Sequence, residues 1–349
     1  MGLVAGKSAM TVGAQPVCTV CIANYNGESL LSDCIDSVLQ QECDFSVEII
    51  VHDDASTDRS LDLLATRYPN IKVIRSVSNV GFCISNNRMV AEALGEFILL
   101  LNNDAALAPD ALSTLYEHAS QQSNQGILTL PQYDWESGEL IDRGCLLDPF
   151  YNPVPNKDEA RREVAMVIGA CLWIPRWLWN DLGGFPEWFD SIAEDMQLCC
   201  HARLAGYPIS VTPGSGYKHR QGKSFGGNRL AQGKLVSTQR RRKLSERNKV
   251  FVMTICTPTP FLPIAILSAF LTLITEGVLL SLLIGNRKIF HDIYLAAIID
   301  AIKNRNKIFV ERKKIQRFRS ISTLRYLRQF TATPQKLKLL MKYGPPKIR

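Results

Sequence analysis

Apolar residues follow two different spacings along the first 120 residues. Short runs of consecutive apolar residues, typical of strands buried on both faces, alternate with segments in which apolar residues recur every three or four positions, as on one side of a helix. Such alternation predicts a parallel sheet covered by helices on both faces. The runs predict strands at 17–23, 47–51, 71–74 and 97–101, and the periodic segments predict helices at 30–39, 60–68, 83–94 and 110–120.

Polar side chains gather where three of these predicted strands end. Any one of these clusters could be a turn or a helix cap, since Asn, Asp and Gly are common turn residues. Three clusters at the carboxyl edge of one parallel sheet instead favour a shared ligand site. The clusters are Asn24 with Asn26, Asp53 with Asp54, and Asn103 with Asp104.

The motifs of common nucleotide-binding folds are absent from the sequence. No GxGxxG follows the first strand, and no GxxxxGK[ST] occurs, so neither a dinucleotide site nor a P-loop is expected. Carboxylates repel phosphates unless a divalent cation lies between them. Asp104 could therefore hold Mg²⁺ or Mn²⁺ against a diphosphate, and Asp53 or Asp54 could accept a hydrogen bond from a base N–H.

The pattern changes after residue 131. Residues 132–163 are rich in Pro, Gly and Asn, an apolar run follows at 164–174, and helices are predicted at 177–182 and 196–205. The glycine-rich segment 214–233 predicts a mobile loop. We expect an N-terminal extension (1–16), a catalytic domain (17–235, divided into 17–131 and 132–235) and a basic, apolar helical region (236–349).

Composition and charge narrow the class of protein. With 349 residues, 46% of them hydrophobic, the chain is globular, and it carries a formal net charge of +7. Beyond Asp300 the only acidic residue is Glu311, so the C-terminal end predicts an anionic partner, either nucleic acid or a membrane surface. Ten scattered cysteines predict reduced thiols. The lone CxxC, Cys18 and Cys21, does not predict a zinc site, because residues three apart on a strand point to opposite faces. The first 16 residues show no signal-peptide pattern.

Residues 261–285 form an apolar segment of about 25 residues, which is long enough to span a bilayer. Prolines at its start and Glu276 within it oppose a span, because an acid at mid-bilayer costs roughly 2.5–3.5 kcal/mol on insertion scales. A single span would also place the basic tail outside if the catalytic domain is cytosolic. Attachment to one leaflet, with an amphipathic helix at 289–302, meets these objections. The alternatives are a buried helical subdomain and a dimer interface.

Several ordered blocks of the chain resemble the family 2 inverting glycosyltransferases of the GT-A fold. Residues 20–26 and the stretch EIIVHDDASTD at 48–58 are similar to the opening of that family, and the resemblance covers about residues 17–225. The later blocks are similar to the branch that contains rhamnosyl- and galactofuranosyltransferases. These are Asn79–Phe82 with Asn86 and Asn87, Gly95-Glu96, residues 101–104, residues 183–185, Glu194-Asp195, Gly206-Tyr207, and His219 followed by Gly222 and Ser224.

The resemblance implies a GT-A fold, a Rossmann-like and mostly parallel sheet with helices on both faces, followed by the helical, membrane-associating C-terminal region. It also implies a donor pocket. Asp104 would be the metal ligand, and His219 would complete the metal shell, although a histidine in a basic loop is usually just solvated. The donor pocket would be lined by Asn24, Asn26, Asp53, Asp54, Asn79, Gly81 and Asn103, with the two aspartates holding the pyrimidine base. Asn103 departs from the family, which has an acid there.

The resemblance further implies that Asp195 is the catalytic base, with Glu194 beside it. Taken alone, two acids there are typical of a helix N-terminus. Trp188 shortly before them is a candidate sugar platform, although such tryptophans more often form core or groove wall. Gln197 and His201 replace an acid and an arginine common in the family, which indicates variation on the acceptor side.

Two carboxylate sites on separate elements fit inverting transfer, which needs a base for the acceptor hydroxyl and a cation for the leaving diphosphate. We therefore expect a metal-dependent glycosyltransferase that uses a nucleoside diphosphate sugar, with deoxythymidine diphosphate–rhamnose favoured, and a lipid-linked or cell-surface glycan. It would work at the cytoplasmic face of the plasma membrane without binding nucleic acid, as a monomer or homodimer. The alternatives are transfer to polyprenyl phosphate itself, and a non-catalytic scaffold that binds membrane or nucleic acid.

Overall fold

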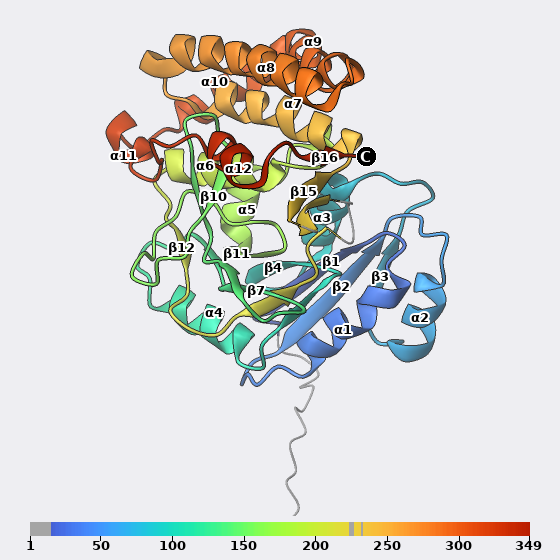
Figure 1. Ribbon diagram of the computed structural model, residues 1–349. Coiled ribbons are helices and arrows are strands. Elements are labelled where there is room, and N and C mark those ends of the chain that lie inside the picture. Colours follow the sequence, from blue (N-terminus) through green and yellow to red (C-terminus); the bar gives the residue numbers. More distant parts are fainter. Residues whose placement is uncertain (1–14, 223–226, 232) are drawn as a thin grey trace, which may run out of the picture.

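The computed structural model describes residues 15–222, 227–231 and 233–349. Its centre is a seven-stranded sheet in the order β12-β6-β11-β4-β1-β2-β3 (Figure 1). The four strands predicted in the first 120 residues are confirmed and form adjacent positions of this sheet. The strands are β1 (Cys18–Asn24), β2 (Val47–Asp53), β3 (Lys72–Arg75), β4 (Phe97–Asn102), β6 (Ile127–Thr129), β11 (Cys171–Pro175) and β12 (Ile209–Val211).

The direction of the strands brings the polar strand ends together. β1 runs parallel to β2 and to β4, with Asn24 opposite Asp53 and Ala23 opposite Asn102. β11 runs antiparallel to β4, so the sheet is mixed, although most of its pairings are parallel. The carboxyl ends of β1, β2 and β4 therefore lie along one edge, where ligands of open α/β sheets bind.

Helices cover both faces of the sheet, as predicted. On one face Val20 and Ile22 of β1 share a core with α1 (Glu28–Leu39) and α4 (Ala111–Ser120). On the other face Cys21 packs with α3 (Phe82–Glu92), α5 (Arg176–Leu182) and α6 (Glu194–Leu204). Cys18 belongs to the first core and Cys21 to the second, so the CxxC pair does point to opposite faces. All ten cysteines are free thiols. α2 (Ser60–Arg67) follows β2.

The second half of the catalytic region builds small sheets. β5 (Ala105–Leu107), β13 (Tyr217–His219), β7 (Gln132–Asp134) and β8 (Leu140–Asp142) form one, and β9 (Cys145–Leu147) pairs with β10 (Pro153–Pro155). The segment 214–233, predicted as a loop, contains β13 and most of a hairpin of β14 (Gly227–Ala231) and β15 (Lys234–Ser237). The local glycine content indicated a loop instead of strands. Local composition also could not show that β15 pairs with β16 (Lys347–Ile348) from the far end of the chain. Ser224 and residues 1–14 lie outside the described residues.

A layer of helices lies over the edge of the sheet that carries the polar strand ends (Figure 1). It comprises α7 (Gln239–Cys256), α8 (Leu262–Ile284), the π-helix η3 (Phe290–Leu295), α9 (Ala296–Lys303) and α10 (Arg305–Arg317). Along the chain, α11 (Thr323–Leu327) and α12 (Gln335–Tyr343) follow this layer. The basic tail folds back onto the domain: Thr331 donates its backbone N–H to Leu147 O, and Gln335 donates to Asp148 Oδ2. The expected helical C-terminal region is thus present, and its boundary near 236 stays a prediction.

α8 has two different faces, although most of its residues are apolar. Ala269, Leu273, Gly277 and Leu280 are buried against the protein at helical spacing. Over the segment 259–284, which is long and apolar enough to cross a membrane, only 22% of the most apolar stretch is buried. The outward side chains include Ile264, Leu267, Leu271, Ile274, Val278 and Leu282.

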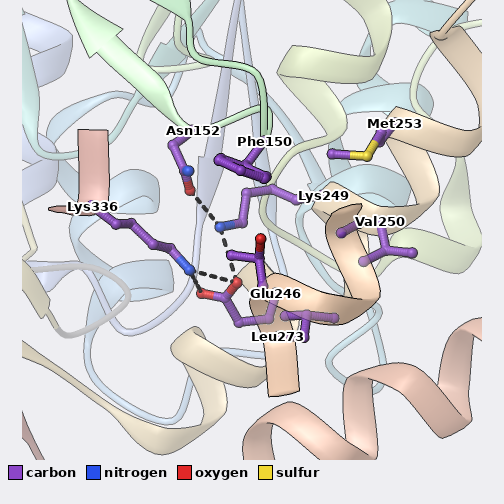
Figure 2. A pocket seen from close by; sticks show the side chains of 10 residues that line it. Phe150, Asn152, Glu246, Lys249, Val250, Met253, Leu273 and Lys336 are labelled. Carbon is purple, nitrogen blue, oxygen red and sulfur yellow. Dashed lines mark hydrogen bonds and ion pairs between the residues drawn. The ribbon is translucent and has the colours of Figure 1, made fainter. Parts of the chain in front are cut away.

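Glu276, the acid within this apolar helix, points into a network of charges. Its carboxylate accepts from Arg242 Nη2 at 2.5 Å and from Lys336 Nζ at 2.6 Å. Lys336 and Lys249 also bind the buried Glu246, at 2.7 and 3.0 Å, as Figure 2 shows. Burial alone would raise the pKa of Glu246, but these cations hold it below its ordinary value. The network ties α7, α8 and α12 together and explains how α8 tolerates an acid.

Candidate active site

Three side chains interlock at the ends of β1, β2 and β4. The buried Asn24 donates through Nδ2 to Asp53 Oδ2 at 3.0 Å, and its Oδ1 accepts from Asn103 Nδ2 at 2.8 Å. Asp53 Oδ1 accepts the backbone N–H of Ser56 at 3.0 Å. An amide at Asn103 can donate to Asn24, which a carboxylate could not do, so the departure from the family's acid has a structural role here.

The loops after β1 and β2 are fastened to one another. Asn26 adopts a positive φ of 51°, and its Oδ1 accepts the backbone N–H of Thr57 at 2.7 Å. Its own backbone N–H donates to Ser56 Oγ at 2.9 Å. Asn26 is exposed, so its amide group borders solvent at this edge of the sheet.

Asp54 binds the start of α3 instead of standing free. Its Oδ1 accepts the N–H of Val80 at 2.7 Å, and its Oδ2 accepts the N–H of Gly81 at 2.9 Å. Gly81 has a φ of 90°, and a Cβ there would meet Asp190 Oδ1 at 2.9 Å, so both conformation and space require glycine. Asn79 is exposed and lies 3.5 Å from the Asp54 carbonyl oxygen. Asp54 therefore places the loop 79–81 beside Asp190.

Asp104 and His219 come from distant parts of the chain and meet at the same edge. Asp104 lies between β4 and β5, directly before Ala105, and β13 aligns His219 opposite Ala105. Both residues are buried, and His219 Nε2 lies 3.0 Å from Asp104 Oδ1. The other ring nitrogen, Nδ1, has no hydrogen-bond partner among the described residues. This pair offers a divalent cation one carboxylate and one imidazole.

Glu194 and Asp195 open α6; Glu194 is buried and Asp195 is half-buried. Asp195 Oδ2 accepts the N–H of Gly169 at 3.0 Å, and its Oδ1 accepts the N–H of Met196 at 2.7 Å. Within the part of the chain that the structure describes, Glu194 Oε2 has no hydrogen-bond partner. Burial, together with the neighbouring Asp195 charge, raises the pKa of Glu194 well above its ordinary value; burial also raises the pKa of Asp195, although the N–H donors and Arg241 oppose it.

Two series of contacts connect the surroundings of Asp54, Asp104 and Asp195. The N–H of Asn102 donates to Ala170 O at 3.1 Å, and Ala170 follows Gly169, the donor to Asp195. Asp104 lies two residues after Asn102. On the other side, Gly81 separates Asp54 from Asp190, whose carbonyl oxygen accepts the N–H of Cys83. Asp54, Asp104 and Asp195 therefore surround one edge of the sheet.

Two candidate acceptor-side residues, Trp188 and His201, pack against other parts of the protein. Trp188 is half-buried, and its ring packs at 4.7 Å from Phe189 and 5.0 Å from Phe251. His201 is buried within α6, where burial and the nearby Lys314 charge lower its pKa to about 4. His201 thus lies near Lys314 of α10, and the acceptor-side roles of both residues stay predictions.

Sequence reasoning missed the partners that α7 supplies to the loop before Glu194. Asn248 and Arg247 donate to backbone carbonyls of that loop. These two polar residues lie between helix and loop, and the spacing of hydrophobic residues along the sequence does not mark them. Ser56, which accepts from Asn26, could have been found, because it lies within the DDAST block that carries the resemblance.

Part of the chain matches a known family and proteins of known activity. Residues 19–176 match the family model described as Glycosyl transferase family 2. A poly(ribitol-phosphate) beta-glucosyltransferase of Bacillus spizizenii is 31% identical over 200 residues, 56% of this chain and 30% of that protein. An N-acetylglucosaminyl-diphospho-decaprenol L-rhamnosyltransferase of Mycobacterium tuberculosis is 25% identical over 211 residues, 52% of this chain and 68% of that protein. The chain thus spans less than a third of the first of these relatives.

Solved structures share the fold. The mannosyltransferase PcManGT from Pyrobaculum calidifontis, in complex with GDP-Man and Mn²⁺, aligns with a TM-score of 0.51 at 19% identity over 84% of this chain and 88% of that one. GalNAc-T7 with UDP, GalNAc and Mn²⁺ aligns with a TM-score of 0.55 at 18% identity over 70% of this chain and 48% of that one. The GT-A-like fold and the resemblance to family 2 are thereby confirmed. Residues 19–176 of this chain are therefore similar to the glycosyltransferases of family 2, and the fold is GT-A-like.

Proposed function

We propose that this protein is a metal-dependent inverting glycosyltransferase that moves a sugar from a nucleoside diphosphate to a lipid-linked or cell-surface glycan. One observation carries the proposal: Asp54, Asp104 and Asp195, from distant stretches of the chain, lie around one edge of the sheet. The cluster of Asn24, Asp53 and Asn103 and the loop that Asp54 holds offer a base and ribose a polar floor. Glu194 and Asp195 lie across from them, where an acceptor would enter.

The residues present fit a divalent cation. The described residues contain no group of three or more His, Cys, Asp or Glu that could hold a metal ion, so protein ligands alone do not complete a site. Mg²⁺ and Mn²⁺ are often held by one or two protein groups together with substrate phosphates. Asp104 and His219 would supply those protein groups, and the donor diphosphate the rest. A bound cation would neutralise charge that develops on the leaving diphosphate.

Asp195 is the residue that we propose as the base. In the reaction the acceptor oxygen forms a bond to the anomeric carbon, the bond from that carbon to the diphosphate oxygen breaks, and the acceptor proton passes to the Asp195 carboxylate. A raised pKa makes Asp195 a better proton acceptor once it is ionised. The N–H groups of Gly169 and Met196 fix its orientation.

A rhamnose-like donor and a lipid-linked acceptor are the finer parts of the proposal. The relative from Mycobacterium tuberculosis is named for L-rhamnose and a decaprenol-linked acceptor, whereas the relative from Bacillus spizizenii is named for glucose and a poly(ribitol-phosphate). Polyprenyl phosphate as the direct acceptor is the alternative within the same fold.

The outward face of α8 supports attachment to one leaflet of a membrane. Its apolar side chains are exposed along the whole helix, and exposed Arg287, Lys288 and Lys303 follow it. Because Glu276 and the buried face of α8 are engaged by the protein, the helix is expected to lie in the interface instead of crossing it. Basic residues next to such a helix attract anionic lipid.

A donor panel tests the catalytic proposal. We expect one or a few nucleoside diphosphate sugars to raise the melting temperature in the presence of Mn²⁺, because a ligand stabilises the folded state by mass action. The shift should shrink strongly with EDTA and in Asp104→Asn. A donor shift that is equal with EDTA would remove the metal from the proposal. No shift and no transfer with any donor would overturn the proposal and favour a non-catalytic scaffold.

Flotation with vesicles tests the membrane proposal. The protein should float with vesicles of phosphatidylcholine and phosphatidylglycerol, and the double variant Leu267→Glu, Leu271→Glu should stay unbound. Leu39→Glu, which changes an exposed leucine of α1, is the matched control and should still float. If the wild-type protein stays unbound and forms a dimer that the double variant dissociates, the face is an interface between two copies.

A further inference from the structure

The loop that leads into Glu194 and Asp195 is held by one buried amide of α7. We infer that Asn248 is a positioning residue, which fixes the loop 189–193 so that the acidic pair at the start of α6 faces the sheet edge. This inference rests on the proposed function, because it concerns the residue proposed as the base. No part of the resemblance includes Asn248, which lies beyond residue 225.

The contacts of Asn248 are unusually complete for one side chain. The two N–H groups of its Nδ2 are shared among three carbonyl oxygens, of Phe189 at 3.0 Å, Ser191 at 2.9 Å and Ile192 at 2.7 Å. Asn248 is fully buried, so water cannot replace these donors. Arg247 adds a bond from Nη2 to Phe189 O at 2.7 Å. Two successive residues of α7 therefore bind the loop directly before the acidic pair.

The loop needs such support because its backbone is strained. Asp190, Ile192 and Ala193 have φ values of 69°, 70° and 68°. Left-handed backbone costs roughly 1–2 kcal/mol per residue outside glycine, and a β-branched residue such as Ile192 is a particular outlier. Strain of this kind persists only where the surroundings determine the conformation, and it clusters at functional sites. The three carbonyl bonds of Asn248 are the surroundings that do so here.

The loop conformation sets where the base points. Ala193 is the residue that precedes the first turn of α6, and its carbonyl oxygen accepts the N–H of Gln197 at 3.0 Å. If the loop relaxed toward ordinary backbone, the first turn would move, and Asp195 with it. A displacement of about 1 Å at a reacting group can cost on the order of 100-fold in rate. Loop 79–81 of the proposed donor pocket touches the loop 189–193 at Asp190 and does not follow it along the chain as α6 does, so donor binding is expected to change less than the rate.

Asn248→Asp is the sharp test, because it keeps the shape of the side chain and removes both N–H donors. Gln316→Glu is the matched control: Gln316 also donates an amide to two backbone carbonyls, of Ile255 and Cys256, but at the opposite end of α7. Both variants are compared with wild type in kcat, in donor dissociation constant and in melting temperature. Asn248→Ser, which retains one donor, serves if Asn248→Asp does not fold.

We expect Asn248→Asp to lower kcat at least 10-fold while the donor dissociation constant changes less than about 2-fold. Gln316→Glu should lose melting temperature but keep kcat within about 2-fold. Asn248→Ser should fall between wild type and Asn248→Asp in kcat. Equal kcat in Asn248→Asp and Gln316→Glu, or equal losses in kcat and donor binding for Asn248→Asp, would overturn the positioning role.

Hydrogen exchange separates this inference from the proposed function. If the wild-type protein transfers no sugar, the proposed function fails, yet the loop can still be observed. Asn248→Asp should then speed exchange of the backbone amides at 190–197, and Gln316→Glu should not. Unchanged exchange at 190–197 in Asn248→Asp would overturn the inference by itself.

Discussion

Two pairs of neighbouring acids lie near the same edge of the sheet, Asp53 with Asp54 and Glu194 with Asp195, and their surroundings differ. Every carboxylate oxygen of Asp53 and Asp54 accepts a hydrogen bond, from Asn24, Ser56, Val80 or Gly81. In the pair of Glu194 and Asp195, the aspartate accepts two backbone N–H groups, but Glu194 Oε2 accepts none from any residue that the structure describes. The second pair also follows a strained loop.

The difference distinguishes acids that hold loops in place from acids proposed to transfer a proton. Carboxylates whose oxygens accept backbone N–H groups hold loops in place, and Asp53 and Asp54 do so for the loops that border the expected nucleotide. Buried acids with too few donors keep a raised pKa, and such groups concentrate at catalytic sites. The first pair is therefore expected to act through geometry and stability, and the second through proton transfer.

The largest effect is expected from Asp195→Asn. Removing the base should lower kcat by about 10²–10⁴-fold, the usual contribution of general base catalysis. Donor affinity should change little, because the donor is expected to contact the residues at the ends of β1, β2 and β4. Steady-state transfer and donor titration measure both quantities. Glu187→Gln, an acid shortly before the same loop, is the control and should retain kcat; normal kcat in Asp195→Asn would assign the base elsewhere.

A smaller and different effect is expected from Asp54→Asn. One carboxylate oxygen becomes an NH₂ group that faces the N–H of Val80 or Gly81, and such an unsatisfied buried contact costs about 1–3 kcal/mol. The melting temperature should fall, and the KM for the donor should rise about 10-fold as loop 79–81 loosens, while kcat at saturating donor stays within a few fold. Loss of kcat with an unchanged melting temperature would place Asp54 with the chemistry.

How far the sequence leads differs between these two pairs. The apolar runs predicted the strands, and their polar ends predicted that Asp53, Asp54 and Asp104 share one edge, because parallel strands bring their ends together. Periodicity could not predict that Asp54 binds the backbone of residues 80 and 81, or that β15 pairs with β16 from the far end of the chain. It also could not reveal Asn248, because non-local contacts leave no spacing in the sequence. The roles of the individual site residues stay predictions.

The smallest effect is a pH dependence of stability that should differ in sign between two buried glutamates. Burial and Asp195 raise the pKa of Glu194 above its ordinary 4.5, so the folded state binds this proton more tightly than the unfolded state. The resulting stability is fully present below about pH 4.5 and is lost as the pH rises through the folded pKa.

Glu194→Gln removes that loss. The free energy of unfolding of Glu194→Gln should therefore increase relative to that of the wild-type protein as the pH rises from 4.5. Glu246 is the opposite case: burial would raise its pKa, but Lys249, Lys336 and Arg242 hold it below 4.5. Ionised Glu246 therefore stabilises the fold above pH 4.5, and Glu246→Gln should fall behind wild type over the same range. Urea unfolding between pH 4 and 8 measures both differences. If the free energy of unfolding depends on pH in the same way for Glu194→Gln and wild type, Glu194 is as well solvated or paired as Asp53 and Asp54. The contrast between the two pairs would then disappear.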